Sequence, residues 1–176
     1  MQKHWSRRDA IRALGLSLGS ATLPFSSWAV DEHQHPILLP DKKISLDKPI
    51  SAITCGAGNR GNVYGGYALQ YPDQLDIIGV AEPIPLRNER YCKKHNISAE
   101  NSFVTWEDVF KRPKFADAII ITTPDNLHYG PCMKALAMGY DVLLEKPISP
   151  SEKECREILA LAKKTGRIVA VCHVLR

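Results

Sequence analysis

Two oppositely charged residues, Glu145 and Lys146, stand at the end of an apolar run, residues 142–144, and directly before Pro147. The run VLL is typical of a buried strand, and a charge that is buried without a partner is costly. Neighbouring side chains on a strand point to opposite faces, so an ion pair between the two residues does not explain them. The pattern therefore predicts that both charges serve a polar site at the end of this strand. The alternative is a surface pair ahead of a loop proline.

A glycine-rich stretch, GAGNRG at residues 56–61, has the composition and spacing of a phosphate-binding loop. It matches G-x-G-x-x-G, follows a predicted strand and opens a predicted helix, whose amino end supplies an anion site. Gly56 makes the tight turn, Gly58 lets the backbone approach a pyrophosphate, and Gly61 lets the helix pack closely on the strand. A glycine turn without a ligand is the alternative. The cofactor-binding residues predicted in this stretch are Gly56, Gly58, Asn59, Arg60 and Gly61.

Glu82 ends the second predicted strand, about 21 residues after Gly61. At this position a carboxylate bonds the 2′-hydroxyl of an adenosine ribose and repels a 2′-phosphate. The sequence therefore favours NAD over NADP as the cofactor. Arg60 and Arg87 are the two cations that could accommodate a phosphate, which leaves NADP as the less favoured alternative.

Short apolar runs alternate with helical stretches from residue 49 onward. The run ADAIIITT, residues 116–123, is β-branched and continuous, as a buried parallel strand is. Gly139 and Gly166 each follow a helical stretch and mark its end. The alternation, with short connections, predicts an α/β fold with a Rossmann-like, doubly wound parallel sheet. The expected strands are residues 50–55, 75–81, 102–105, 116–123, 140–144 and 167–174, and later helices are expected from about residues 106, 126 and 151.

The first 29 residues are typical of an export signal. Arg7 and Arg8 precede an apolar stretch, residues 13–23, that is too short to span a bilayer as a helix. The pattern resembles a twin-arginine translocation signal, with a Sec signal or an amphipathic helix packed on the domain as alternatives. We therefore expect a periplasmic or exported protein without a membrane segment after cleavage. The expected organisation is a signal at residues 1–29, a linker at 30–48 and one folded domain at 49–176.

The composition limits the possible partners. Of 176 residues, 44% are hydrophobic, which is enough for one ordinary domain. Three of the four net positive charges belong to the first 29 residues, so the near-neutral remainder gives no electrostatic reason to expect nucleic acid. Five cysteines without Cys-x-x-Cys spacing indicate free thiols, buried where they fall in apolar runs. His33 and His35 lie in the predicted linker, and no metal site is expected.

Three motifs, GAGNRG, TTPDNLH and EKPIS, occur in this order at the ends of predicted strands, and residues 49–176 thereby resemble the Gfo/Idh/MocA oxidoreductases. Glu-Lys-Pro after the fifth strand is the most specific of the three. The resemblance implies a dinucleotide-binding domain followed by a larger α/β domain with an open, mixed sheet. The chain ends where the sixth strand would lead into that second domain, so we expect a Rossmann domain truncated before it.

The resemblance also implies roles for the charged pair. Ligands of open α/β sheets bind at the carboxyl ends of strands, so Lys146 would lie beside the nicotinamide and the substrate hydroxyl. An ammonium there polarises the oxygen, and it relays a proton if burial lowers its pKa. Lys146 is therefore the candidate catalytic residue. Glu145 would contact the nicotinamide ribose or orient Lys146, and Pro147 would fix the turn through a cis bond.

The same resemblance assigns further contacts to the TTPDNLH motif and to the sixth strand. Thr123 and Pro124 would end the fourth strand against the cofactor. Asn126 and His128 would line the ribose–nicotinamide side, with a helix N-cap at Asn126 and a solvated His128 as the alternatives. His173, at the end of the sixth strand, would face the same crevice.

Together these inferences predict the NAD-binding part of an oxidoreductase that transfers hydride between a sugar or polyol and a nicotinamide cofactor. A redox-neutral glycosidase of the same superfamily, working on one bound NAD, is the runner-up. A non-catalytic dinucleotide-binding fragment is the third hypothesis. The full-length protein is expected to be a homo-oligomer, with the substrate ligands and general base in the second domain.

Overall fold

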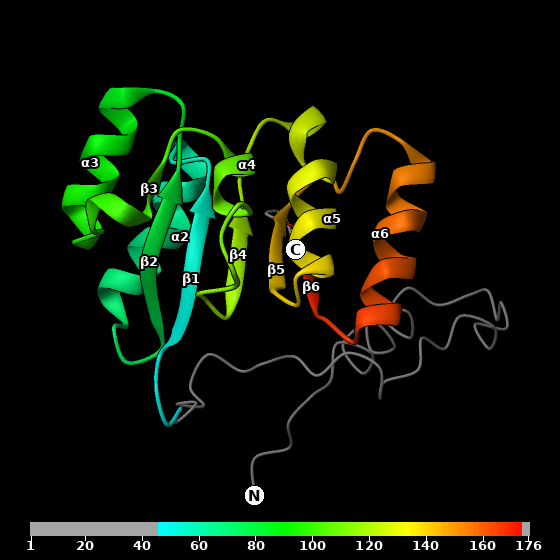
Figure 1. Cartoon of the computed structure of the whole chain (residues 1–176), viewed down its shortest axis with the longest axis horizontal. Coiled ribbons are helices and arrows are strands. Elements are labelled where there is room, and N and C mark those ends of the chain that lie inside the picture. Colours follow the sequence, from blue (N-terminus) through cyan, green and yellow to red (C-terminus); the bar gives the residue numbers. More distant parts are fainter. Residues whose placement is uncertain (1–45, 174–176) are drawn as a thin grey trace, which may run out of the picture. The chain divides into compact units, whose positions relative to one another are not determined.

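The computed structural model describes residues 46–173. The predicted signal peptide, His33, His35 and most of the predicted linker lie outside the described residues. The described chain forms a six-stranded sheet in the order β3-β2-β1-β4-β5-β6 (Figure 1). Every pair of neighbouring strands is parallel, so the predicted Rossmann-like, doubly wound sheet is confirmed.

All six predicted strands are present. The strands are β1 (Ile50–Cys55), β2 (Leu75–Ala81), β3 (Ser102–Phe103), β4 (Ala118–Ile121), β5 (Asp141–Glu145) and β6 (Val169–Cys172). The α-helices are α2 (Asn59–Gln70), α3 (Pro85–His95), α4 (Trp106–Val109), α5 (Tyr129–Ala137) and α6 (Glu152–Thr165), with short 3-10 turns η1 (Ala99–Asn101) and η2 (Asp125–Leu127). Over residues 46–173, no helix is both long enough and apolar enough to cross a bilayer.

Strands β3, β4 and β6 are shorter than the sequence predicts, and β4 and β6 stop at their carboxyl ends where their partners stop. The last residue of β4, Ile121, pairs with Cys55, after which β1 turns into the glycine loop. The last residue of β6, Cys172, pairs with Glu145, which ends β5. The length of a parallel ladder is thus set by the neighbouring strand as well as by the strand's own apolar run.

The side chains of β4 alternate between the two faces of the sheet. Ile119 and Ile121 belong to a buried cluster that includes residues of α4, α5 and α6. Ile120 belongs to a second cluster, with Ala68 of α2 and Tyr91 of α3. Helices therefore cover both faces of the sheet, as a doubly wound fold requires, and Figure 1 shows α5 and α6 in front of it.

The ends of the later helices follow the local sequence. The hydroxyl of Ser151 caps α6 by accepting a bond from the N–H of Glu154. Gly166 ends this helix in the left-handed region, at φ 65°. Gly139, at φ 81°, follows α5 in the same region. The predicted stop signals are confirmed.

The start of α5 differs from the prediction. A 3-10 turn, η2, intervenes, and Asn126 lies inside this turn. The N-cap position of α5 belongs to His128, and the helix begins at Tyr129. The interpretation of Asn126 as the N-cap of this helix is therefore wrong.

All five cysteines lie in the described part of the chain and are free thiols, as predicted. Cys55 and Cys132 are buried, and burial raises the pKa of each thiol to about 12. Cys172 was expected in a buried run but is only half-buried, because β6 is the edge strand of the sheet.

Candidate functional site

The carboxyl ends of four strands carry the residues that the sequence singles out. The glycine loop follows β1, Glu82 follows β2, Thr123 lies just beyond β4, and Glu145 ends β5. The helices after β1 and β4 cover opposite faces, so the sheet changes its winding direction between these two neighbouring strands. Such a switch point is where open α/β sheets bind ligands.

The glycine loop is shaped by close backbone contacts. Gly56 has φ +99°, and a Cβ atom there would lie 2.6 Å from the carbonyl oxygen of Thr122. At Gly61 a Cβ would lie 2.1 Å from the carbonyl oxygen of Gly56, so α2 packs directly on the loop. The predicted turn and packing roles of these two glycines are confirmed. At Gly58 the nearest atom to an added Cβ is Nη1 of Arg87, 3.9 Å away, so this side of the loop is open.

The amino end of α2 has the properties of an anion site. Gly58 is its N-cap residue, no side chain caps the helix, and its first turn contains no acidic residue. The first N–H groups of a helix lack partners within the helix and carry a partial positive charge. A phosphate group at this end would therefore find donors that no side chain occupies.

Glu82 is buried at the end of β2. Its Oε2 accepts a bond from the N–H of Ala57 at 2.7 Å, and its Oε1 accepts one from the N–H of Ile84 at 3.0 Å. The carboxylate thus fastens the glycine loop to the segment that leads into α3. The sequence did not indicate this structural role, because both partners are backbone groups.

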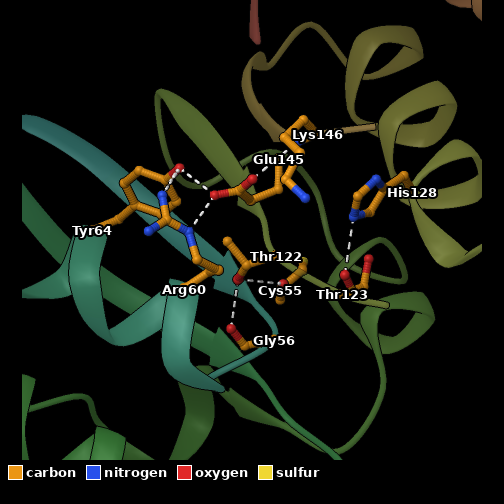
Figure 2. A network of polar contacts seen from close by, with 9 residues as sticks. All are labelled: Cys55, Gly56, Arg60, Tyr64, Thr122, Thr123, His128, Glu145 and Lys146. Carbon is orange, nitrogen blue, oxygen red and sulfur yellow. Dashed lines mark hydrogen bonds and ion pairs between the residues drawn. The ribbon is translucent and has the colours of Figure 1, made fainter. Parts of the chain in front are cut away.

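Arg60 and Tyr64, one turn apart on α2, both reach the carboxylate of Glu145 at the end of β5 (Figure 2). Nε of Arg60 lies 2.5 Å from Oε1, and the hydroxyl of Tyr64 donates to the same oxygen at 2.7 Å. The other oxygen, Oε2, accepts the backbone N–H of Lys146 at 2.9 Å. These three donors explain how an acidic residue can end a buried strand.

This network gives Arg60 a structural role that the sequence did not indicate, since its guanidinium pairs with Glu145, while its contact with a phosphate stays a prediction. Tyr64 was not predicted, because its partner is 81 residues away in the sequence. The available signal was its spacing from Arg60: residues four apart lie on one face of a helix. Nη2 of Arg60 also donates to the hydroxyl of Tyr64 at 2.9 Å.

Opposing effects act on the carboxyl group of Glu145. Burial disfavours the charged form, whereas the bonds from Tyr64, Arg60 and the backbone favour it. The net result is a pKa below the ordinary carboxyl value. The hydrogen bond to Glu145 raises the pKa of Arg60, and burial raises the pKa of Tyr64. At neutral pH the site therefore holds a charged pair and a protonated phenol.

His128 is 1% exposed, so the interpretation of a solvated side chain is wrong. Its Nδ1 lies 2.6 Å from the carbonyl oxygen of Pro147. Its Nε2 lies 3.0 Å from the carbonyl oxygen of Thr123, as Figure 2 shows. A neutral ring can donate to only one of these acceptors. The ring ties the segment after β4 to the turn after β5. The peptide bond between Lys146 and Pro147 in this turn is cis, as predicted.

The other predicted site residues lie at the surface. Lys146 is exposed, so the condition set for a proton relay, burial of its ammonium, is not met by the described residues 46–173 alone. Thr123 lies beyond the end of β4, and its hydroxyl donates to the carbonyl of Leu127 at 3.0 Å. Thr123 is half-buried, and the remaining predicted contacts are exposed: Asn59, Pro124, Asn126 and His173.

A parallel sheet with a glycine turn and an uncapped helix at its switch point defines a Rossmann-type dinucleotide-binding domain. In the described part of the chain, no group of three or more His, Cys, Asp and Glu side chains is arranged to hold a metal ion. Residues 42–173 match the Gfo/Idh/MocA family, an oxidoreductase family with an NAD-binding Rossmann fold. The chain belongs to this family.

Two relatives and one solved structure are examples of what the chain is similar to. YfiI of Bacillus subtilis, an uncharacterized oxidoreductase, is 36% identical over 138 residues, which are 73% of this chain and 35% of that protein. IolW of the same organism, a scyllo-inositol 2-dehydrogenase (NADP(+)), is 27% identical over 118 residues, 67% of this chain and 31% of that protein. The WlbA dehydrogenase of Chromobacterium violaceum, solved with NADH and UDP-GlcNAcA, superposes with a TM-score of 0.66 at 22% identity, covering 72% of this chain and 35% of that one. The chain thus spans about a third of the length of the relatives that it matches.

Proposed function

We propose that the chain is the cofactor-binding part of an NAD-dependent oxidoreductase that acts on a sugar or polyol. The observation that carries the proposal is the meeting, at one edge of the sheet, of the open glycine loop at Gly58 and the Glu-Lys-Pro turn held by Glu145. The substrate class is supported by the relatives, one of which is named for a cyclic polyol and another of which was solved with a sugar nucleotide.

In this proposal the diphosphate of the cofactor lies at the uncapped amino end of α2, where Gly58 leaves the backbone open. Glu82 lies beside the same loop and is the proposed partner of the adenosine ribose, which makes NAD the expected cofactor. The residues proposed to line the nicotinamide side are Thr123, Pro124, Asn126, Glu145 and His173, and the buried ring of His128 would support them through the carbonyl of Thr123.

Exchange of a hydride with a substrate carbon is the chemistry that a nicotinamide supplies when it is bound. Nζ of Lys146 would hydrogen-bond the substrate oxygen, giving it a proton as an ammonium when a carbonyl is reduced and taking the hydroxyl proton as an amine when an alcohol is oxidised. Glu145 would act on Lys146 by positioning, because its Oε2 holds the backbone N–H of that residue. The substrate ligands and the general base are proposed to come from a second domain of the full-length protein.

The test is a calorimetric titration of the 176-residue chain with NADH. In the variant Gly58→Ala the added methyl meets no protein atom within 3.9 Å, so the fold is retained while the approach of a diphosphate is obstructed. We expect an affinity for NADH at least about tenfold lower. Gly66→Ala is the matched control, because its Cβ, on the same helix, meets nothing within 4 Å. Equal NADH affinity of the two variants, or no binding by the unmodified chain, would overturn the proposal.

A further inference from the structure

The side chain of Lys146 is placed by the backbone that carries it. It is exposed, and within residues 46–173 no ion pair holds its ammonium. The backbone, in contrast, is held on both sides of this residue. The N–H of Lys146 donates to Oε2 of Glu145 at 2.9 Å. The carbonyl oxygen of the next residue, Pro147, lies 2.6 Å from Nδ1 of His128. The region that the ammonium can reach is therefore set by these two attachments.

The attachment at Glu145 leads to helix α2, as Figure 2 shows. Nε of Arg60 lies 2.5 Å from Oε1 of this carboxylate, and the hydroxyl of Tyr64 donates to the same oxygen at 2.7 Å. Nη2 of Arg60 donates to the Tyr64 hydroxyl at 2.9 Å, and the guanidinium carbon lies 5.1 Å from the centre of the tyrosine ring. The phenol thus bridges the cation and the carboxylate, so the loss of its hydroxyl would remove two bonds at once.

Neutralising the buried charge of Glu145 does not by itself require Tyr64, because Arg60 already supplies a positive charge at Oε1. What the phenol adds is direction. A second donor on Oε1, one helical turn further along α2, restricts the rotation of the carboxylate and leaves Oε2 facing the N–H of Lys146. Burial alone would raise the pKa of Glu145, whereas the bonds from Tyr64 and Arg60 lower it, so Oε2 remains a charged and strong acceptor.

We infer that Tyr64 is a positioning residue for Lys146. Together with Arg60 it holds the Glu145 carboxylate, and through this carboxylate the backbone of Lys146, at a fixed place relative to α2. The inference rests on the proposed function, which places a diphosphate at the amino end of this helix and a proton transfer at Nζ. One helix would then align the cofactor with the group that exchanges the proton. A displacement of about 1 Å at such a group costs on the order of a hundredfold in rate.

The first test follows the amide proton of Lys146 by NMR while the pH of the 176-residue chain is lowered from about 7 to about 3.5, the range in which carboxyl groups titrate. This proton is donated to Glu145, so its chemical shift reports the charge of that carboxylate. In the unmodified chain the midpoint should lie below 4.5, the ordinary value. Tyr64→Phe should move the midpoint to higher pH, because burial persists while a bond to the charged form is lost. Tyr67→Phe, at an exposed position of the same helix, is the matched control and should leave the midpoint in place.

The second test adds NADH to the unmodified chain and to both variants. Tyr64 is not among the residues proposed to bind the cofactor, so the dissociation constant of Tyr64→Phe should stay within about threefold of that of the unmodified chain. The amide shifts of residues 56–61 should change as before. The change at Lys146 should be smaller in Tyr64→Phe than in Tyr67→Phe, because the turn is no longer held against α2. A role in stability alone would move neither this change nor the pH midpoint, since both are properties of the folded chain.

The outcomes separate the inference from the proposed function. A midpoint that Tyr64→Phe does not move, or an equal NADH-induced change at Lys146 in the two variants, would overturn the inference and leave the proposed function intact. An amide proton of Lys146 in the unmodified chain that does not follow the titration of Glu145 would overturn it as well, even if Tyr64→Phe failed to fold. Absence of NADH binding by the unmodified chain would overturn the proposed function itself.

Discussion

Arg60 of α2 and Glu145 of β5 form an ion pair, with Nε of the arginine 2.5 Å from the carboxylate, although 85 residues separate them in the sequence. The pair joins the helix whose amino end would hold a diphosphate to the turn that carries Lys146. The contact therefore fixes the position of this turn relative to α2.

Replacing Tyr64 with Phe removes one of the three donors to the buried carboxylate of Glu145. Because this bond has a charged acceptor, we expect the free energy of unfolding in urea to fall by about 1.5–3 kcal/mol. Tyr67→Phe is the matched control, because Tyr67 is an exposed residue of the same helix and its hydroxyl donates to Gln74. The free energy of unfolding of this variant should fall by less than about 0.5 kcal/mol. Equal losses in the two variants would show that the buried network does not stabilise the fold.

Replacing Glu82 with Ala removes the acceptor of two backbone N–H groups. We expect a loss of about 1–3 kcal/mol in the free energy of unfolding, because the glycine loop is released. The affinity for NADH should fall more than the affinity for NADPH, because the proposed ribose contact is lost and a 2′-phosphate is no longer repelled. Glu89→Ala, at an exposed position of α3, should change neither quantity. Unchanged stability combined with weaker binding of NADH alone would mean that Glu82 acts only on the ribose.

His95 should make the stability of the fold depend on pH. Burial lowers the pKa of this histidine below its ordinary value of 6.5, the charge of Lys94 lowers it further, and Asp76 acts in the opposite sense. In the described part of the chain, its Nε2 is buried without a hydrogen-bond partner. On acidification the unfolded chain therefore takes up a proton before the folded chain does. Stability should be full above the unfolded pKa and fall as the pH drops below it.

The measurement for His95 is urea unfolding at a series of pH values between about 7.5 and 5, the range in which histidine titrates. The unmodified chain should lose stability across this range, and His95→Leu should flatten the profile. His173→Gln removes an exposed histidine and should leave the profile unchanged. If His95→Leu leaves the dependence of stability on pH unchanged, the assignment of this dependence to His95 is contradicted.

The amino-terminal residues carry a prediction about export. Twin-arginine export moves folded proteins, so a full-length protein with this signal would take its dinucleotide with it. We expect the protein in the periplasm with nucleotide bound, and we expect Arg7→Lys with Arg8→Lys to retain it in the cytoplasm. Cell fractionation measures export, and the nucleotide content of the purified protein measures whether the cofactor is carried with it. Unchanged export of the double variant would indicate the Sec route and would remove the reason for a carried cofactor.

The fold could be predicted because its determinants are local. Each strand is a short apolar run, and residues such as Gly56, Ser151 and Gly166 mark turns and helix ends through their own backbone preferences or hydrogen bonds. The glycine loop and the Glu-Lys-Pro turn were visible because their residues are contiguous.

The parts that could not be predicted depend on contacts between distant segments. His128 bonds the carbonyl of Pro147, 19 residues away, and a backbone acceptor leaves no trace in the sequence. Glu82 likewise bonds backbone groups, and Tyr64 reaches Glu145 across the sheet. Side-chain types at these positions were informative, but their partners were set by the way the strands pack.

The most direct test of the central claim, a dinucleotide site at the carboxyl edge of the sheet, is the mapping of amide chemical shifts by NMR as NADH is added to the labelled chain. The largest changes should fall on residues 56–61 and on the backbone N–H of Lys146, which follow β1 and β5. Residues 163–166 at the carboxyl end of α6, which leads into β6 at the opposite edge of the sheet (Figure 1), should show no change. Changes confined to α6, or none at residues 56–61 at saturating NADH, would contradict the claim.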